Sequence, residues 1–420
     1  MIKYTQKCRL CGSSSLKTII DLGDQHVQGA FLTKNNRNPP LRKLPNQIVW
    51  CDVKNGGCSL VQSNITASRE ILFSAYFYQS GVNESMRNHL KEITDKLLTF
   101  NQNPKKVLDI AANDLTLLLN YPSTIERWGI DPNNIIINAS KKHNDINIVN
   151  DFFPSNRLTD KFDLISAIAV MYDLDCPTDF VKSAIDQLTP DGIFCFEVMY
   201  LPTMMKDLAW DAISAEHLTH WSLSTITTLI DSVGGKIIDV DLTTTNGGSI
   251  LVFVTKKDCL KYRNTDTSQK ILEISKQEFD FELDNWETMQ CFSSRIKNHQ
   301  KELKTFLHSL KQQGKKISLY GASTKANVLI EGANIEKYFS YGIERSEEKV
   351  GGETLWGLPI ISEEFARKDM DENTVWFLGP YFFRRGVLLR EKEFIDRGGE
   401  FLIPLPQILT VNRKNYKDQV

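Results

Sequence analysis

A carboxylic acid and an imidazole are adjacent in the middle third of the chain, at Glu216 and His217. Imidazole titrates near neutral pH, and a neighbouring carboxylate can orient the ring and raise its proton affinity. Neighbouring residues of a regular helix point apart, so this pair can cooperate only in a loop or at the end of an element. We interpret His217 as a candidate general base. The alternative is a surface glutamate beside a helix-terminal histidine, and His220 is interpreted as a helix-face residue.

A second polar run could bind a nucleotide cofactor. It begins at Asp109, directly after an apolar segment, and continues through small residues to Thr116. An apolar run followed by an acid and small residues is typical of the turn after the first strand of a nucleotide-binding sheet. The turn departs from the dinucleotide fingerprint, which would have glycines at the positions of Ala111 and Leu115.

Two more acidic positions follow successive strand-like segments. Asp131 stands where a carboxylate would bind ribose hydroxyls. Asp151 could accept a hydrogen bond from an adenine amino group while Phe152 packs against the ring. Each acid alone could be a solvated loop residue, but three in order favour a cofactor site. The predicted cofactor-binding residues are Asp109, Ala111, Asn113, Asp131, Pro132, Asp151 and Phe152.

Four of the eight cysteines lie in a short, turn-rich N-terminal segment, as the pairs Cys8 with Cys11 and Cys51 with Cys58. The first pair has the usual zinc-knuckle spacing and the second is wider. Four thiolates can close a tetrahedral zinc site, whose role would be structural because no coordination position stays open for substrate. The alternative is two pairs of unliganded thiols.

Composition narrows the class of protein. The 420 residues exceed one core, because single cores stop growing near ~250 residues. Lys and Arg (50) balance Asp and Glu (52), which argues against a nucleic-acid partner. The chain has no apolar run of the ~18 residues that a membrane helix needs, and it opens without a signal-peptide pattern. We therefore expect a cytoplasmic monomer with no membrane partner.

The apolar pattern predicts an α/β protein. A helix is expected where Met86, Leu90, Ile93 and Leu97 recur at helical spacing. Alternation of strands with amphipathic segments predicts a parallel, doubly wound sheet. The predicted strands cover residues 107–110, 124–130, 146–149, 162–167 and 192–197. Residues 235–241 and 248–254 could add an antiparallel edge pair.

A charged segment from Lys256 to about Leu310 is interpreted as solvated helix. The α/β pattern then restarts, with strands expected at residues 316–320, 338–343, 374–378 and 400–403 and a helix at 326–332. We therefore expect three domains, which cover residues 1–70, 71–260 and 261–420.

Taken in order, these motifs resemble the sugar C-methyltransferases that act on nucleotide-linked deoxysugars. The resemblance covers nearly the whole chain. Its landmarks are Asp21-Leu-Gly23, Tyr76-Phe-Tyr78-Gln-Ser80, Asn113-Asp114, Pro190-Asp-Gly192, Glu216-His217-Leu218, Gly247-Gly-Ser249, the segment from Tyr320 to Lys325, and Pro404-Leu-Pro406.

The resemblance implies a zinc-binding N-terminal domain, a class I S-adenosylmethionine-dependent methyltransferase domain and a C-terminal Rossmann-like domain. In that family a 4-keto nucleotide sugar loses a proton next to its carbonyl, and the enolate attacks the methyl carbon of S-adenosylmethionine, which leaves S-adenosylhomocysteine. By likeness His217 would be the base, Glu216 its partner or a sugar ligand, and Asp131 the ribose ligand. Tyr76 is included with the catalytic residues. The substrate-binding residues would be Tyr78, Ser80, Asn246 and Ser249.

The chain departs from the family pattern at several positions. Ser214 stands where the family usually has a tyrosine, and Asp173 where it commonly has a histidine. An arginine after the Gly-Gly-Ser sequence is replaced by Leu251. Two alternatives therefore stay open: methyl transfer to a hydroxyl or other heteroatom of a nucleotide sugar or glycan precursor, and a catalytically silent cofactor-binding protein. A nicotinamide-dependent dehydrogenase is disfavoured because neither sheet module has the glycine fingerprint.

Overall fold

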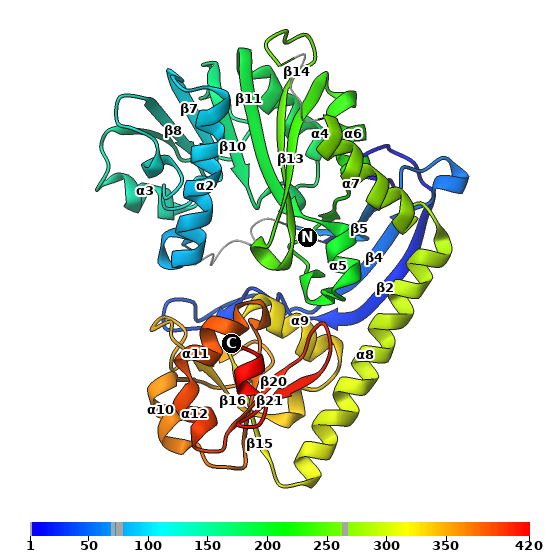
Figure 1. The fold of residues 1–420 in the computed structure, drawn as a ribbon, viewed down its shortest axis with the longest axis vertical. Helices are drawn as coiled ribbons and strands as arrows, with labels where there is room; N and C mark the ends of the chain where they lie inside the picture. Colours follow the sequence, from blue (N-terminus) through cyan, green and yellow to red (C-terminus); the bar gives the residue numbers. More distant parts are fainter. Residues whose placement is uncertain (1, 69–71, 73–78, 263–267) are drawn as a thin grey trace.

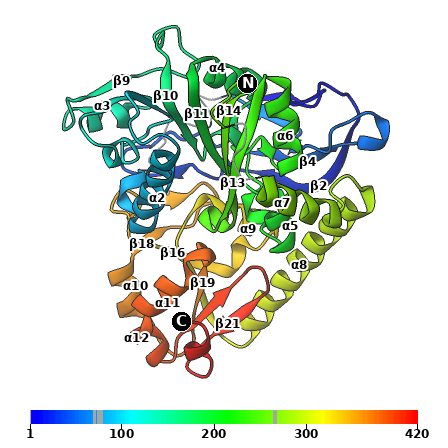
Figure 2. The same cartoon turned by 45° about the horizontal axis from the view of Figure 1, so that its top comes forward.

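The computed structural model describes residues 2–68, 72, 79–262 and 268–420. Its largest sheets have seven, six and four strands. Figure 1 shows the seven-stranded sheet at the top, the six-stranded sheet at the bottom, and strands β2 and β4 along one side between them. Figure 2 shows the same arrangement from a tilted view, with helix α8 running down that side.

The N-terminal region is built mainly from β-strands, with few helical residues. Its four-stranded sheet has the order β12-β5-β4-β2, so strand β12 from the middle of the chain completes it. In that pairing Thr219 lies opposite Gln62, and His220 opposite Val61. The strands are β1 (Ile2–Tyr4), β2 (Leu16–Gln25), β3 (Phe31–Leu32), β4 (Leu44–Cys51), β5 (Val61–Ser63), β6 (Ile65–Ala67) and β12 (Thr219–His220).

The seven-stranded sheet has the order β13-β14-β11-β10-β7-β8-β9. Strands β9, β8, β7, β10 and β11 are parallel, as the alternating pattern predicts. The expected antiparallel edge pair is confirmed as β13 and β14. The strands are β7 (Lys106–Ile110), β8 (Glu126–Ile130), β9 (Ile146–Val149), β10 (Phe162–Ile168), β11 (Leu188–Met199), β13 (Gly235–Thr243) and β14 (Ser249–Lys256).

Helices cover this sheet, and the periodic residues account for the first of them. Helix α2 begins after Asn83, whose side chain accepts a hydrogen bond from the Ser85 amide and so caps the helix. Its buried face contains Leu90, Ile93 and Leu97, which confirms the helical spacing. The helices are α2 (Glu84–Phe100), α3 (Asn134–Ser140), α4 (Pro177–Asp186), α5 (Leu201–Lys206) and α6 (Leu223–Ser232).

The charged segment after β14 forms helices α7 (Ser268–Phe281) and α8 (Trp286–Gln312). The prediction of a solvated helix is wrong for one face of α8, where apolar side chains recur at helical spacing and are buried. His299 on this face accepts a hydrogen bond from the indole of Trp210, and its other ring nitrogen lies 2.7 Å from the carbonyl oxygen of Pro404. Helix α8 therefore packs against both halves of the molecule. None of the described helices is long and apolar enough to span a bilayer.

The C-terminal sheet has the order β18-β16-β15-β19-β20-β21, and only β21 is antiparallel to its neighbour. The predicted strands are confirmed within a few residues. The elements are β15 (Lys316–Tyr320), α9 (Thr324–Gly332), β16 (Phe339–Glu344), β17 (Glu353–Thr354), β18 (Ile360–Ser362), α10 (Glu363–Asp369), β19 (Thr374–Leu378), α11 (Arg384–Arg390), α12 (Lys392–Asp396), β20 (Glu400–Ile403) and β21 (Leu409–Val411).

A buried polar seam joins the N-terminal strands to the middle and C-terminal parts. The Asn46 side-chain amide donates to the carbonyl of Ile213 (2.7 Å), and the Gln28 side chain accepts from the Ala215 amide (3.2 Å). On the other side, Asn327 of α9 donates to the carbonyl of Gln28 at 2.7 Å. Buried polar groups are costly unless they are paired, so these bonds specify one arrangement of the parts.

The turn after β7 keeps a glycine-like backbone without glycines. Ala111 (φ 60°), Asn113 (φ 50°) and Leu115 (φ 68°) all have left-handed conformations. Such a conformation costs an L-residue roughly 1–2 kcal/mol. Two of the three positions, Ala111 and Leu115, are those where the fingerprint would have glycine.

We predict that Ala111→Gly leaves the free energy of unfolding unchanged or raises it by up to about 1 kcal/mol. Relief of left-handed strain offsets the extra flexibility that glycine gives the unfolded chain. Ala112→Gly is the matched control, because Ala112 is buried and does not have a positive φ, so glycine relieves no strain there. That control should destabilise the protein in urea titrations. Equal losses for both variants would contradict the interpretation.

Candidate active site and metal centre

The four N-terminal cysteines converge. Their sulfur atoms all lie within 4.8 Å of one another. The Cys8–Cys58 and Cys11–Cys51 pairs are 3.6 Å apart. A tetrahedron with Zn–S bonds of about 2.3 Å has edges of about 3.8 Å, so the donor set fits zinc. Backbone amides of Leu10 and Cys58 donate to the sulfurs of Cys8 and Cys51, which favours the thiolate form that binds metal.

A tight turn sets the spacing of the second pair. Asp52 caps the short 3-10 helix η1 (Val53–Asn55), and Gly56 follows in a left-handed conformation. A Cβ atom on Gly57 would lie 2.7 Å from the sulfur of Cys51, so the close return of the chain requires glycine there. The wider spacing of this pair is therefore compatible with a compact site.

The predicted cofactor residues meet at the carboxyl end of β7 and β8. Asp131 accepts hydrogen bonds from the amides of Asn113 (3.0 Å) and Asn133 (2.7 Å). Asp109 is buried beneath them and accepts from the hydroxyl of Ser166 at 2.6 Å. Burial raises the pKa of Asp109 to about 7 and also raises the pKa of Asp131. Pro132 lies directly between Asp131 and Asn133, in the same connection.

The segment before α2 docks onto this turn. The amide of Ser80 donates to the side chain of Asn113 (3.1 Å), and the amide of Gly81 to that of Asp114 (2.8 Å). Ser80, predicted to bind substrate, thus lies at the cofactor turn. Tyr76 and Tyr78 fall outside the described residues.

Asp151 and Phe152 follow β9 as predicted. The Asp151 carboxylate accepts from the Phe152 amide at 2.8 Å and from the Ser155 hydroxyl at 2.6 Å. Phe152 is 44% exposed, so its side chain lies partly at the surface. The carboxylate is thus partly occupied by local contacts.

Glu216 and His217 lie in a turn between the 3-10 helix η5 (Trp210–Ala212) and β12, not on a helix. His217 Nδ1 lies 2.6 Å from the carbonyl oxygen of Ala212, so Nδ1 carries the proton and Nε2 keeps its lone pair. Its ring meets Tyr172 edge-on at 4.7 Å between centroids. Burial lowers the pKa of His217 to about 4, with a smaller contribution from the positive charge of Lys325.

Glu216 has a different partner from the one that its position suggests. Its carboxylate accepts a hydrogen bond from the amide of Gly29 in the N-terminal region, and a Cβ on Gly29 would lie 2.2 Å from it. Burial raises the pKa of Glu216 to about 7. The interpretation of Glu216 as the group that orients His217 is therefore wrong, because the His217 ring is hydrogen-bonded to the Ala212 carbonyl instead.

Several buried polar atoms surround this turn without a hydrogen-bond partner in the described part of the chain. They are Asp173 Oδ1, Asp211 Oδ2, Ser214 Oγ and both ring nitrogens of His220. Burial, and then the charge of Glu216, raise the pKa of Asp173. His220 lies in strand β12 rather than on a helix face, which corrects that interpretation. Unpaired buried polar atoms are costly, and a polar ligand could pair with them.

Asn246 and Ser249 flank the turn between β13 and β14, at the 3-10 helix η6 (Thr245–Gly247). The Ser249 hydroxyl donates to the carbonyl of Thr245 at 3.0 Å and is buried. The Asn246 carbonyl accepts from Lys325 at 2.7 Å. Both residues therefore shape the turn. Lys325 was not among the predicted site residues, although it closes the small-residue turn after β15.

With this geometry established, comparison with known proteins assigns the chain to a class. Three consecutive family models match it: a zinc binding domain at residues 8–73, a methyltransferase domain at 82–240 and a C-methyltransferase C-terminal domain at 244–406. The C-methyltransferase NovU of Streptomyces niveus is 22% identical over 431 residues, which cover 97% of this chain and 97% of that protein.

Two solved structures resemble part of the chain. An S-adenosylmethionine-dependent methyltransferase from Clostridium acetobutylicum is 14% identical, with a TM-score of 0.35 over 44% of this chain and 95% of that one. The PH0226 protein of Pyrococcus horikoshii is 15% identical, with a TM-score of 0.37 over 46% of this chain and 100% of that one.

The protein is an S-adenosylmethionine-dependent methyltransferase with a class I α/β methyltransferase domain. It belongs to the C-methyltransferase family, as its zinc binding, methyltransferase and C-terminal domains together show. The three-part C-methyltransferase organisation expected from the sequence motifs is thus confirmed.

We predict that Cys11→Ser lowers the zinc content well below one ion per chain and lowers the melting temperature by several degrees. A structural zinc site contributes directly to folding free energy, and loss of one of four thiolates weakens it. Elemental analysis and thermal unfolding check this outcome. Cys291→Ser is the control, because Cys291 is exposed on α8. Wild-type protein that is purified without chelator and contains no zinc would contradict the assignment.

We predict that Asp131→Ala weakens S-adenosylhomocysteine binding by about 1–3 kcal/mol, the usual range for a charged hydrogen-bonding group. The loss combines ribose contacts with release of the Asn113 and Asn133 amides. Titration calorimetry gives the affinity. Asp160→Ala is the control, because Asp160 pairs with Lys106 at the opposite end of β7. Unchanged affinity in Asp131→Ala would refute the assignment.

Proposed function

We propose that the enzyme transfers a methyl group to a carbon next to a ketone in a nucleotide-linked deoxysugar. The observation that carries this proposal is the hydrogen bond between His217 Nδ1 and the Ala212 carbonyl (2.6 Å). It leaves Nε2 as an unprotonated base in a half-buried position. S-adenosylmethionine supplies the electrophilic methyl group when it is bound.

The pKa of His217, lowered to about 4 by burial, keeps the ring neutral at physiological pH. A neutral imidazole can accept the proton of a carbon acid, whose electrons move onto the carbonyl oxygen as the C–H bond breaks. The resulting imidazolium and enolate form an ion pair, and their attraction is strongest where water is excluded. The attraction raises the basicity of His217 during the reaction above its value in the empty site.

Several features support the nucleotide sugar as acceptor. The serial resemblance of motifs extends over all three parts of the chain, and the curated relative NovU, a C-methyltransferase, matches this chain over 97% of its own length. The unpartnered polar atoms of Asp173, Ser214 and His220 suit the several hydroxyl groups of a sugar. We place the methionine end of the cofactor at the turn from Asp109 to Asn113 and its ribose at Asp131.

A second candidate is methyl transfer to a hydroxyl group of the same class of acceptor. It is favoured by Ser214, which stands where the family usually has a tyrosine and whose buried hydroxyl has no partner among the described residues. An O-methyltransferase does not need a group that polarises a ketone. Mass spectrometry of a panel of 4-keto nucleotide sugars after incubation with S-adenosylmethionine tests for turnover, and NMR of the product distinguishes C- from O-methylation.

We predict that His217→Ala lowers methyl transfer by roughly 10²–10⁴-fold, the usual contribution of a general base, while S-adenosylhomocysteine binding is unchanged. Exchange of the sugar proton with solvent deuterium, measured without methyl donor, isolates the proton-transfer step. His143→Ala, in the connection between α3 and β9, is the control. Persistent exchange in His217→Ala would assign the base to another residue.

The pH profile distinguishes His217 from Glu216 as the base. With a pKa near 4, His217 is unprotonated over the whole range above about pH 5, so it predicts activity that is flat down to that pH. Glu216, with a pKa near 7, would act as a base only above neutrality, and activity would fall as the pH drops below 7. We expect the flat profile. An acidic limb near pH 7 that disappears in Glu216→Gln would make Glu216 the base.

A further inference from the structure

A lysine of the C-terminal domain contacts two loops of the methyltransferase domain. Lys325 is the second residue of α9, and its ammonium donates to the carbonyl of Asn246 at 2.7 Å. The ammonium also lies 4.0 Å from Asp211 Oδ2. Asp211 belongs to the 3-10 helix η5, which directly precedes the turn that carries His217. The lysine side chain is 15% exposed, whereas that of Asp211 is fully buried. The ammonium is thus held within the protein and still accessible to a ligand.

The C-terminal sheet holds this lysine in place. Gly321 has a left-handed conformation (φ 82°), and a Cβ there would lie 2.5 Å from the ring of Pro380, so the chain turns sharply after β15. Ser323 then caps α9 through the amide of Ala326. The turn and the cap together aim the first turn of α9, and with it Lys325, at the loop between β13 and β14.

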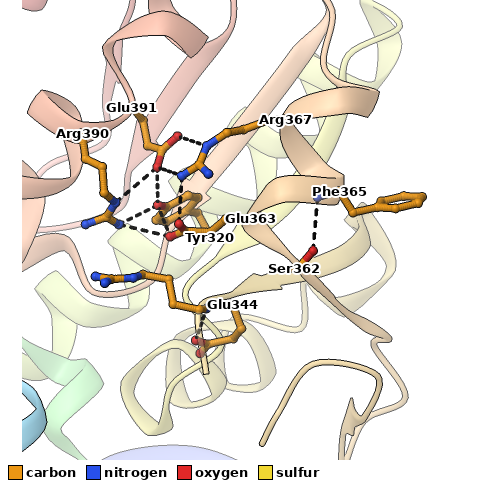
Figure 3. Close-up of polar contacts among 9 residues, drawn as sticks. Tyr320, Glu344, Ser362, Glu363, Phe365, Arg367, Arg390 and Glu391 are labelled. Atoms are coloured by element: carbon orange, nitrogen blue, oxygen red, sulfur yellow. Dashed lines mark hydrogen bonds and ion pairs between the residues drawn. The ribbon is translucent and has the colours of Figure 1, made fainter. Parts of the chain in front are cut away.

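The residue before the turn is fixed as well. Tyr320 Oη lies 2.6 Å from Glu363 Oε1 and accepts a hydrogen bond from Arg390 at 2.7 Å. Arg367 pairs with both Glu363 and Glu391, which closes the network drawn in Figure 3. A charged network with these mutual contacts restrains the end of β15, so the position of Lys325 is determined by its own domain.

Two opposing effects act on the pKa of Lys325. Burial lowers its pKa, but the charge of Asp211 acts in the opposite direction. The ammonium also lies over the ring of Phe382, 4.7 Å from its centroid, which is a favourable position for a cation. Of its three N–H donors, the one to Asn246 is the only hydrogen bond within the described part of the chain.

A base that gains a proton becomes positively charged, and a nearby cation repels that charge. The arrangement is favourable only if an anion forms between the two. The charge of Lys325 is felt at His217, where it opposes protonation of the ring. Removal of a proton next to a ketone puts negative charge on the ketone oxygen. An oxygen bound near Lys325 would accept a hydrogen bond from one of the remaining N–H groups of the ammonium. The negative charge on that oxygen would offset the repulsion between the ammonium and the new imidazolium.

We propose that Lys325 donates a hydrogen bond to the ketone oxygen of the acceptor and stabilises the enolate that forms when His217 removes the proton. The C–H bond breaks, an N–H bond forms at His217 Nε2, and the electron pair moves to the oxygen; Lys325 keeps its proton. The C-terminal domain thereby contributes a catalytic residue to the methyltransferase site. This role rests on the proposed function.

The test compares Lys325→Met with wild-type enzyme on the 4-keto nucleotide sugar that serves as acceptor. We expect solvent deuterium exchange and kcat to fall by roughly 10²–10³-fold, as when one donor to a developing oxyanion is removed. KM for the acceptor should change by no more than about threefold, because the contact strengthens as charge develops. Lys325→Arg should recover part of the exchange rate.

Lys315→Met is the matched control, because Lys315 belongs to the same domain, has a side chain of similar exposure (17%), and pairs with Glu400 directly before β15, at the end of the strand opposite to the turn that carries Lys325. Melting temperature and zinc content are measured for every variant. If both lysine variants lose activity in proportion to stability, the role of Lys325 is structural and the proposal is overturned. It is equally overturned if Lys325→Met exchanges at the wild-type rate.

Two other results would show whether the role of Lys325 alone, or also the proposed function, is wrong. A raised Kd for the free nucleoside diphosphate in Lys325→Met, with kcat unchanged, would show that the lysine binds the diphosphate, and would leave the proposed function intact. Absence of both exchange and C-methylation in active wild-type enzyme, with O-methylated product instead, would overturn the proposed function and the enolate role together.

Discussion

The arrangement of the site depends on one short segment, Asp211 to His220, that all three parts of the molecule hold. The N-terminal strands bind it through Asn46 and Gln28 and pair with it as strand β12. The C-terminal domain contacts Asp211 through Tyr381 at 3.2 Å. A turn of this kind has little local preference for one conformation. Its geometry, including the direction of His217, is therefore a property of the assembled domains.

This constraint gives the zinc centre an indirect role. A metal that joins Cys8 and Cys11 to Cys51 and Cys58 would tie the segment before β2 to the end of β4, and would so stabilise the sheet to which β12 adds. Gly29, whose amide binds Glu216, lies on the same part of the chain. The metal centre can thus influence the base while all four of its coordination positions are occupied by protein.

Local sequence predicts those parts of the fold whose signals are local. Apolar runs identified the parallel strands, and the helical spacing of Leu90, Ile93 and Leu97 identified α2. Asp131 was predicted to bind the cofactor because the end of a second parallel strand is a place where a carboxylate can meet one, and the structure places Asp131 at the end of β8. The contacts of Glu216 with Gly29, and of Lys325 with Asn246, could not be found in this way, because each joins segments far apart in the chain. The solvated interpretation of α8 failed because the many charges of that segment obscured its apolar stripe.

The absent glycines of the cofactor turn show how a pattern can be lost while its physical basis is kept. Ala111 and Leu115 adopt the left-handed backbone that glycine would adopt without strain. Leu115 is fully buried, and its side chain would contact a Cβ placed on Gly129 at 3.2 Å. Packing energy of a buried leucine, about 1.5–3 kcal/mol, exceeds the roughly 1–2 kcal/mol of strain. A glycine there would remove the strain but also the packing, so the native residue is favoured by the balance. The glycine fingerprint is therefore one way to obtain the left-handed backbone that this turn needs. A turn that obtains the same backbone through the packing of larger side chains can still present its amides and carboxylates to a cofactor.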